Sequence, residues 1–197
     1  MASVEEMLRR KALAAVAVLA GLAVTSCGGG GAAEPSVGHE TPGQATGAPK
    51  PATPPRTGPA KATALADKCA VVTEEQWREL GADKAPRERT SNGKPGCQYQ
   101  KGDAGAQGWG VFVAVSDQTS FEEQVQKRSA PTKTTDLGGY PAAEYQSKLG
   151  CVLFAGVSDR GFVISNALST STADPGVDMC QQAEKFAQAA IQNLPNA

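Results

Sequence analysis

Histidine and aromatic residues are scarce in this sequence. Its 197 residues include a single histidine, His39, and only 5% of the chain is aromatic. His39 lies in a Gly- and Pro-rich stretch, where a lone imidazole is solvated. Outside that stretch there is no imidazole at all, so Ser-His-Asp or Cys-His triads and histidine-rich metal sites are excluded.

An excess of charge of either sign is also missing. Lys and Arg number 19 against 20 Asp and Glu, which gives a formal net charge of -1. A near-neutral chain has no basic field to hold phosphates, so we expect no nucleic-acid partner. The length leaves room for one globular domain with tails.

A long membrane-spanning run is absent, but a shorter apolar run of 13 residues covers positions 12–24. Arg9, Arg10 and Lys11 precede it, and Val-Thr-Ser-Cys ends at Cys27. This order is typical of a secretory signal peptide, here residues 1–26, whether translation starts at Met1 or Met7. The Val-Thr-Ser-Cys motif resembles the bacterial lipobox, which would make Cys27 the acylated first residue of an exported, membrane-anchored protein. The alternative is an ordinary signal peptide.

Large apolar residues are nearly absent from 28–62, which instead holds 8 of the 22 glycines and 7 of the 13 prolines. Such a segment cannot bury enough surface to offset the entropy of ordering. We therefore expect residues 27–62 to form a lipid-anchored, disordered linker and residues 63–197 to form the globular domain.

Four cysteines remain in the predicted domain. In an exported protein an even set indicates two disulfides, although the sequence alone permits three pairings. We favour Cys69 with Cys97 and Cys151 with Cys180, each enclosing a similar loop. A four-thiolate zinc site is the alternative, but the chain has no C-x-x-C pair. We expect no metal and no cofactor.

Three helices are indicated by capping signals. T-E-E-Q at 73–76 forms a capping box before Trp77, and Thr119 with Ser120 opens a second, surface helix. Apolar residues at helical spacing from Pro175 to Leu194, preceded by Asp174, predict a third.

Short β-prone runs separated by turn residues predict an antiparallel sheet of five to six strands. The runs are 97–100, 109–116, 134–137, 142–146, 151–157 and 161–168. The run at 109–116 is apolar on both faces, so both should be covered. The fold class expected is α+β, with helices packed on the sheet and two disulfides as staples.

The order of these pieces resembles a known family. A lipobox, a Pro-rich linker, T-E-E-Q-W-x-x-L-G after Cys69, C-Q-Y, G-G-Y-P-A, and a helix ending in N-L-P are similar to actinobacterial cell-envelope lipoproteins of the domain of unknown function 3558 family. The resemblance implies an exported protein with paired cysteines and no established catalytic residues. The element order also looks like a PsbP-like sandwich.

The function expected is that of a noncatalytic binding or accessory module. Its expected partner is a cell-wall component or an envelope protein, and the chain is expected to be a monomer. Trp109 and Tyr140 are the candidate ligand-binding aromatics, and Tyr140 should be exposed in a turn beside Gly138, Gly139 and Pro141. A carrier that holds a lipid or small molecule between helix and sheet is one alternative.

A carboxylate-based cell-wall hydrolase is the other alternative, and it needs two acidic side chains facing each other across a cleft. The candidates are Asp67, Glu74, Glu75, Glu79, Asp83, Glu88, Asp103, Asp117, Glu122, Glu123, Asp136, Glu144, Asp159, Asp174, Asp178 and Glu184. Four of them, at 74, 75, 122 and 123, are explained as charges at helix N-termini.

Overall fold

The computed structural model describes residues 53–103, 107–170 and 176–197. The predicted signal peptide, Cys27 and most of the predicted linker lie outside these residues. No helix among the described residues combines the length and apolar character needed to cross a bilayer.

A seven-stranded antiparallel sheet forms the centre of the domain. Its strands are β1 (Lys84–Ser91), β2 (Lys94–Lys101), β3 (Trp109–Ser116), β4 (Lys133–Asp136), β5 (Pro141–Gln146), β6 (Gly150–Ser158) and β7 (Gly161–Ser169). The order across the sheet is β1-β2-β3-β7-β6-β5-β4, so β3 pairs with β7, far along the chain. The helices are α1 (Glu74–Glu79), α2 (Phe121–Gln126) and α3 (Met179–Asn193).

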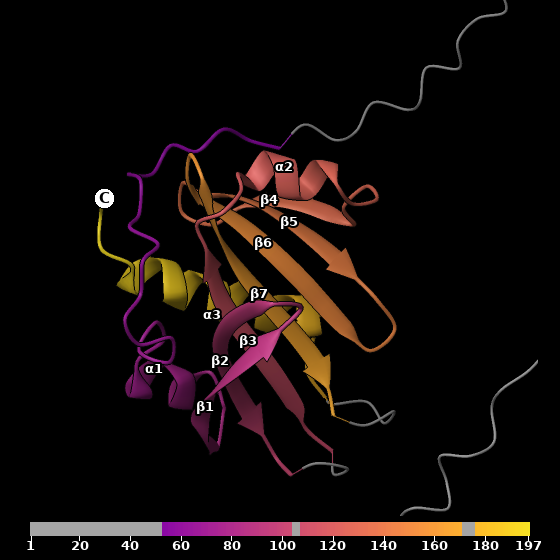
Figure 1. Cartoon of the computed structure of the whole chain (residues 1–197). Coiled ribbons are helices and arrows are strands. Elements are labelled where there is room, and N and C mark those ends of the chain that lie inside the picture. The colour runs from indigo at the N-terminus through magenta and orange to yellow at the C-terminus, as the bar shows by residue number, and fades with distance from the viewer. Residues whose placement is uncertain (1–52, 104–106, 171–175) are drawn as a thin grey trace, which may run out of the picture. The chain divides into compact units, whose positions relative to one another are not determined.

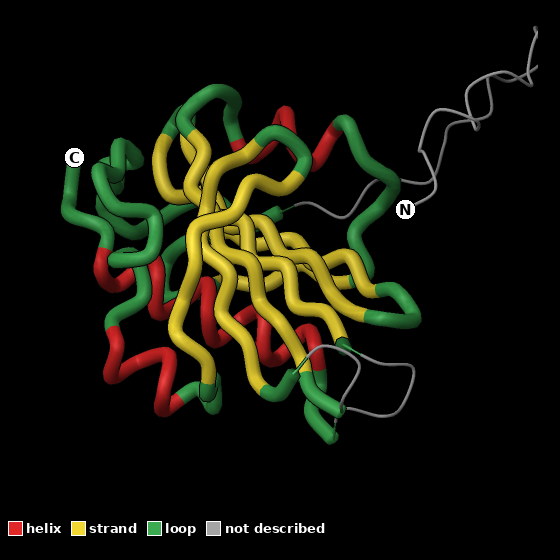
Figure 2. The backbone as a smooth tube through the Cα atoms, turned by 60° about the horizontal axis from the view of Figure 1, so that its bottom comes forward, coloured by secondary structure: helices red, strands yellow, loops and turns green. Residues whose placement is uncertain are grey.

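The two faces of the sheet are covered unequally. α3 crosses one face, behind the strands in Figure 1, and Figure 2 shows the twisted strands from a second angle. The larger core lies on this face and includes Trp109, Val111 and Phe186. On the opposite face a smaller core joins Phe121 and Val125 of α2 to three sheet residues, Ala143, Phe154 and Phe162.

The α+β fold class is confirmed, with one more strand than the upper expected number. β1 was missed because Lys-Ala-Pro-Arg-Glu-Arg-Thr-Ser has no apolar alternation, and most of its side chains are exposed at the sheet edge. Its register shifts between Lys84 and Arg87, around Pro86, which cannot donate a hydrogen bond to the ladder.

The helix ends follow their capping chemistry. Thr73 caps α1 with both hydrogen bonds of the predicted capping box, and Ser120 caps α2. α3 begins later than expected, because Asp178 is its N-cap and accepts a hydrogen bond from the Gln181 backbone N–H. The prediction of a start at Pro175 is therefore wrong.

The folded unit begins before the predicted boundary at residue 63. The backbone N–H groups of Thr57 and Gly58 both donate to the carbonyl oxygen of Gly139, and that of Lys61 donates to Val157 at 2.9 Å. Residues 57–62 are thus part of the domain surface, where neighbouring backbone satisfies their polar groups despite their Gly- and Pro-rich sequence.

The structure contains two disulfides, which join Cys69 to Cys97 and Cys151 to Cys180. These are the pairings that the loop lengths favoured. The first ties the segment before α1 to β2, and the second ties β6 to the first turn of α3. All four domain thiols are therefore used in covalent bonds.

Candidate functional site

Part of the sheet face opposite α3 has no helix over it. There a groove of about 320 Å³ crosses β1, β2, β3 and β7, and we call it the sheet groove. It is lined by Arg87, Arg89, Ser91, Gln98, Gln100, Gly110, Phe112, Asn166, Leu168, Ser169 and Thr170. None of these residues is acidic.

The strand register places the groove residues in rows. Arg87 lies opposite Gln98, Gln98 opposite Phe112, and Phe112 opposite Asn166. Directly opposed residues of neighbouring antiparallel strands share a face, so these four side chains form one row across the groove. The row runs from a cation at the edge of the sheet to an amide near its centre.

Gln98 fixes the polar wall of the groove. Its side-chain amide donates to the backbone carbonyl of Tyr99 at 3.1 Å, and its carbonyl oxygen accepts a hydrogen bond from Arg89 at 3.2 Å. This placement depends on Gly110, since a Cβ there would lie 2.6 Å from Nε2 of Gln98. Glycine on β3 thus leaves the room in which Gln98 orients Arg89.

The floor of the groove combines apolar surface with an unsatisfied acceptor. Leu168 is 43% exposed, one of three large apolar side chains exposed in the described part of the chain. The Oδ1 atom of Asn166 is buried and has no hydrogen-bond partner among the described residues. Buried acceptors in proteins are normally paired, so this atom marks a place that a ligand or solvent group could complete.

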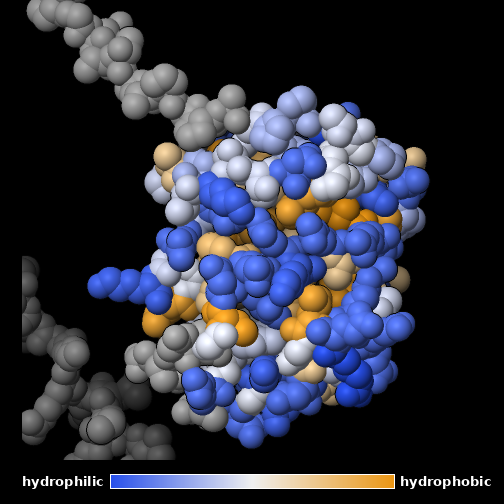
Figure 3. Space-filling model, turned by 180° about the vertical axis from the view of Figure 1, so that it is seen from behind, coloured by the Kyte–Doolittle hydropathy of each residue, from blue (hydrophilic) through white to orange (hydrophobic). Residues whose placement is uncertain are grey.

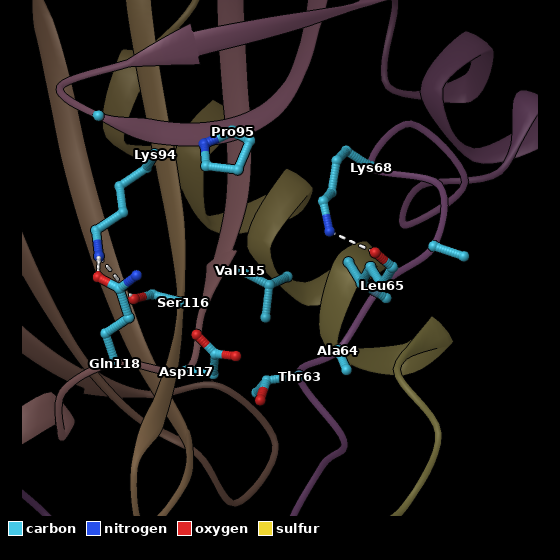
Figure 4. A pocket seen from close by; sticks show the side chains of 12 residues that line it. Thr63, Ala64, Leu65, Lys68, Lys94, Pro95, Val115, Ser116, Asp117 and Gln118 are labelled. Atoms are coloured by element: carbon cyan, nitrogen blue, oxygen red, sulfur yellow. Dashed lines mark hydrogen bonds between the residues drawn. The ribbon is translucent and has the colours of Figure 1, made fainter.

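A second cavity, of about 580 Å³, lies where residues 63–68 pass the end of β3 and the β1–β2 turn (Figure 4). Its two lysines are already engaged. Lys94 donates to Ser116 Oγ at 3.1 Å and to Gln118 Oε1 at 3.0 Å, and Lys68 donates to the carbonyl of Leu65. This cavity therefore offers a ligand fewer uncommitted cations than the sheet groove does.

A third cavity, of about 470 Å³, is lined by three of the candidate carboxylates, Glu144, Asp178 and Glu184, and the first and last of these meet at one lysine. Lys133 Nζ donates to Glu144 Oε1 at 3.1 Å and to Glu184 Oε1 at 2.8 Å. Sequence reasoning placed Glu144 and Glu184 among scattered surface charges, because 40 residues separate them in the chain. Only the packing of α3 beside β4 and β5 joins them.

The two carboxyl groups differ in their titration. Burial and a hydrogen bond to Glu184 raise the pKa of Glu144, whose side chain is almost wholly buried. Burial would also raise the pKa of Glu184, but hydrogen bonds from Lys133 and Glu144 outweigh it and lower that pKa. Of the two, Glu144 is therefore the carboxyl group that takes up a proton first as the pH falls.

A carboxylate oxygen of Glu144 lies within 4.8 Å of the sulfur atoms of Cys151 and Cys180. This grouping has the residue types of a metal site. Both sulfurs are in a disulfide, however, and the thiolate is the form that ligates metal. The geometry therefore does not fit a metal centre while the bond is intact.

The predicted ligand aromatics have other roles. Trp109 is 2% exposed and packs edge-on against Phe186, with ring centroids 5.9 Å apart. Its ring is in the main core, so it offers no face to a ligand. The binding role rested on the ability of aromatic rings to stack on ligands, whereas the place of Trp109 at the start of a strand equally describes a core residue.

The expectation that Tyr140 is exposed is wrong, since its exposed fraction is 5%. Residues 57–59 lie across it, and its hydroxyl donates to the carbonyl of Pro59 at 2.9 Å. Tyr140 does line a cavity of about 350 Å³ with Lys61 and Ile191. Sequence reasoning missed this covering segment because residues 57–59 lie in the Gly- and Pro-rich stretch predicted to be a linker.

Figure 3, seen from behind the view of Figure 1, shows a mainly hydrophilic surface with hydrophobic residues in separate small areas. The groove residues Arg87, Arg89 and Asn166 were all missed by sequence reasoning. β1 has no strand-like pattern, and Asn166 follows Ser165 in a run that is otherwise apolar.

The fold and the groove together define an α+β domain with two disulfides and an open, partly cationic sheet face. The family model described as Protein of unknown function (DUF3558) matches residues 22–193, so the chain belongs to that family. Neither a curated protein nor a solved structure matches. The resemblance to a PsbP-like sandwich therefore stays a prediction.

Proposed function

We propose that this protein is a noncatalytic, lipid-anchored module of the cell envelope that binds its ligand in the sheet groove. The signal-peptide pattern and the lipobox-like motif ending at Cys27 support export and anchoring. The observation that carries the binding role is the groove itself, where two arginines, an unsatisfied amide oxygen and an exposed leucine converge on a face with no covering helix.

A carrier that holds its cargo between helix and sheet receives less support. Along α3, Ala183, Phe186, Ala187 and Ala190 are all 0% exposed, so side chains fill the space between this helix and the sheet. The sheet groove on the opposite face offers a carrier an open site without a covering helix. The binding module and a carrier that uses the groove share the same site.

The hydrolase alternative is also weaker. Glycoside hydrolysis needs two carboxyl groups set apart on either side of the scissile bond. Glu144 and Glu184 instead meet at one lysine and share a hydrogen bond. This arrangement accounts for their charge within the protein and leaves no space between them for a sugar.

Intact-mass analysis of the exported protein tests the anchoring. We expect the mass of a diacylglyceryl group on Cys27 and the loss of four protons for the two disulfides. Cys27→Ala should release the protein from the membrane fraction. An exported chain that keeps an unmodified Cys27 and stays soluble would contradict the proposal.

A further inference from the structure

The charges of the sheet groove are not balanced by the protein. Some other cationic side chains pair with carboxylates, as Arg56 does with Asp159 at 2.7 Å and Arg78 with Glu74 at 2.8 Å. Neither Arg87 nor Arg89 has a carboxylate within ion-pair distance among the described residues. Both are exposed and line the same groove.

The spacing of the two arginines suits a single anionic group. Positions i and i+2 of a strand point to one face and lie about 7 Å apart along it. Two guanidinium groups at that spacing can converge on one carboxylate or phosphate, the groups that arginine binds with paired hydrogen bonds. Gln98 already orients Arg89 toward this side of the sheet through its 3.2 Å hydrogen bond.

Beyond the arginines, two large apolar side chains, Phe112 and Leu168, line the groove among polar ones. Phe112 occupies the centre of the row, and Leu168 exposes 43% of its surface beside it. The same face continues over β6 with Val152, which lies opposite Asn166 and is only partly buried. An apolar chain that leaves the arginines could therefore bury its surface against Leu168 and Val152.

From these relationships the geometry points to an amphipathic anion as the ligand of the sheet groove. Its carboxylate or phosphate head binds Arg87 and Arg89, and its apolar body lies over Phe112 and Leu168. A donor group on the ligand can satisfy Oδ1 of Asn166. This inference rests on the proposed function and names the class of ligand that the groove takes.

Calorimetric titration tests the inference. The full-length chain is embedded in nanodiscs of phosphatidylcholine, a lipid without net charge, and empty nanodiscs serve as the blank. Hexyl phosphate is the probe and inorganic phosphate is the head group alone. We expect hexyl phosphate to bind about tenfold more tightly than inorganic phosphate, because its chain buries apolar surface. Its affinity should fall at high salt.

Variants locate the binding. Arg87→Gln with Arg89→Gln should weaken hexyl phosphate by about tenfold or more, because two charge-assisted contacts are lost. Arg78→Gln with Arg160→Gln removes the same charge elsewhere and should leave the affinity unchanged. Leu168→Gln should weaken hexyl phosphate but not inorganic phosphate. All these side chains are exposed, and thermal unfolding followed by circular dichroism checks that each variant is folded.

Equal affinity of the Arg87/Arg89 variant and the unaltered chain would overturn the inference, and so would equal affinity for the two probes. Added phosphatidylglycerol in the nanodisc separates the possible sources of the anion. Competition with hexyl phosphate would assign the site to a lipid head group, and its absence would assign it to a free amphiphile; both support the inference. Failure of the anchoring proposal is seen separately, as an unmodified Cys27 in the intact mass.

Discussion

The hydroxyl of Tyr140 donates a hydrogen bond to the backbone carbonyl of Pro59 at 2.9 Å, across 81 positions of sequence. The ring also packs against Gly58, where a Cβ would come within 2.7 Å of it. These contacts hold the first described residues onto the turn between β4 and β5. Tyr140 is thus the residue around which this segment is attached to the domain.

Tyr140→Phe should lower the free energy of unfolding by about 0.5–1.5 kcal/mol, the usual contribution of one hydrogen bond. Cleavage by trypsin at Arg56 and Lys61 should become faster, because the segment is held less firmly. Tyr145→Phe is the matched control, since that hydroxyl is buried without a partner among the described residues. A larger loss for the control than for Tyr140→Phe would refute this account, measured by urea unfolding.

The disulfides should contribute similarly to stability, because they enclose loops of nearly equal length, with sequence separations of 28 and 29. In the chain-entropy description each contributes ~3 to 4 kcal/mol. We expect Cys69→Ala with Cys97→Ala, and separately Cys151→Ala with Cys180→Ala, to lower the free energy of unfolding by that amount in chemical denaturation. If a double variant were as stable as the unaltered chain, the disulfide that it lacks would not contribute to the free energy of unfolding.

Phe186→Ala should be among the most destabilising single changes in α3. Phe186 is fully buried, and its ring centroid lies 5.1 Å from that of Tyr99. Removing such a side chain costs about 3–5 kcal/mol through lost burial and the cavity left behind. Lys185→Ala, at an exposed position next to it, should change stability by no more than about 0.5 kcal/mol. Urea unfolding measures both, and similar values for the two variants would contradict the core assignment.

Glu144 and Glu184, which we call the acid pair, should make the free energy of unfolding depend on pH. Burial raises the pKa of Glu144 in the folded state, so this group stabilises the folded state at low pH. That contribution is lost as the pH rises from the ordinary carboxyl pKa through the raised pKa of the folded state. Glu184, whose pKa is lowered, stabilises above its ordinary value and loses that contribution as pH falls through the lowered one.

Glu144→Gln should therefore make the free energy of unfolding fall less steeply as the pH rises above the ordinary carboxyl pKa. Glu184→Gln should lower the free energy of unfolding at neutral pH, because it removes the ion pair with Lys133. Unfolding free energies measured from about pH 2.5 to pH 8 test both, over a range that spans ordinary carboxyl titration. The opposite order, with Glu144→Gln the more destabilised variant at neutral pH, would show that the buried carboxylate is a net stabilising charge.

Local signals in the sequence determined much of the fold. Thr73 and Ser120 cap their helices through side chains a few residues from the N–H groups they satisfy. The apolar runs of β3, β6 and β7 specify strands through a two-residue period that neighbours alone establish. These features depend on residues close in sequence, so they could be predicted, and the β1 edge strand, which buries little, could not.

What only the tertiary structure decided are the relationships between distant segments. The pairing of β3 with β7 places Phe112 beside Asn166, and the packing of α3 brings Glu184 to Glu144. The choice of which strand lies next to which is made by the burial of whole faces, and no local pattern encodes it. The sequence by itself therefore determined the capped helices α1 and α2 and the apolar strands. The sheet groove and the pair of Glu144 with Glu184 depend on tertiary packing between segments that are far apart in the sequence.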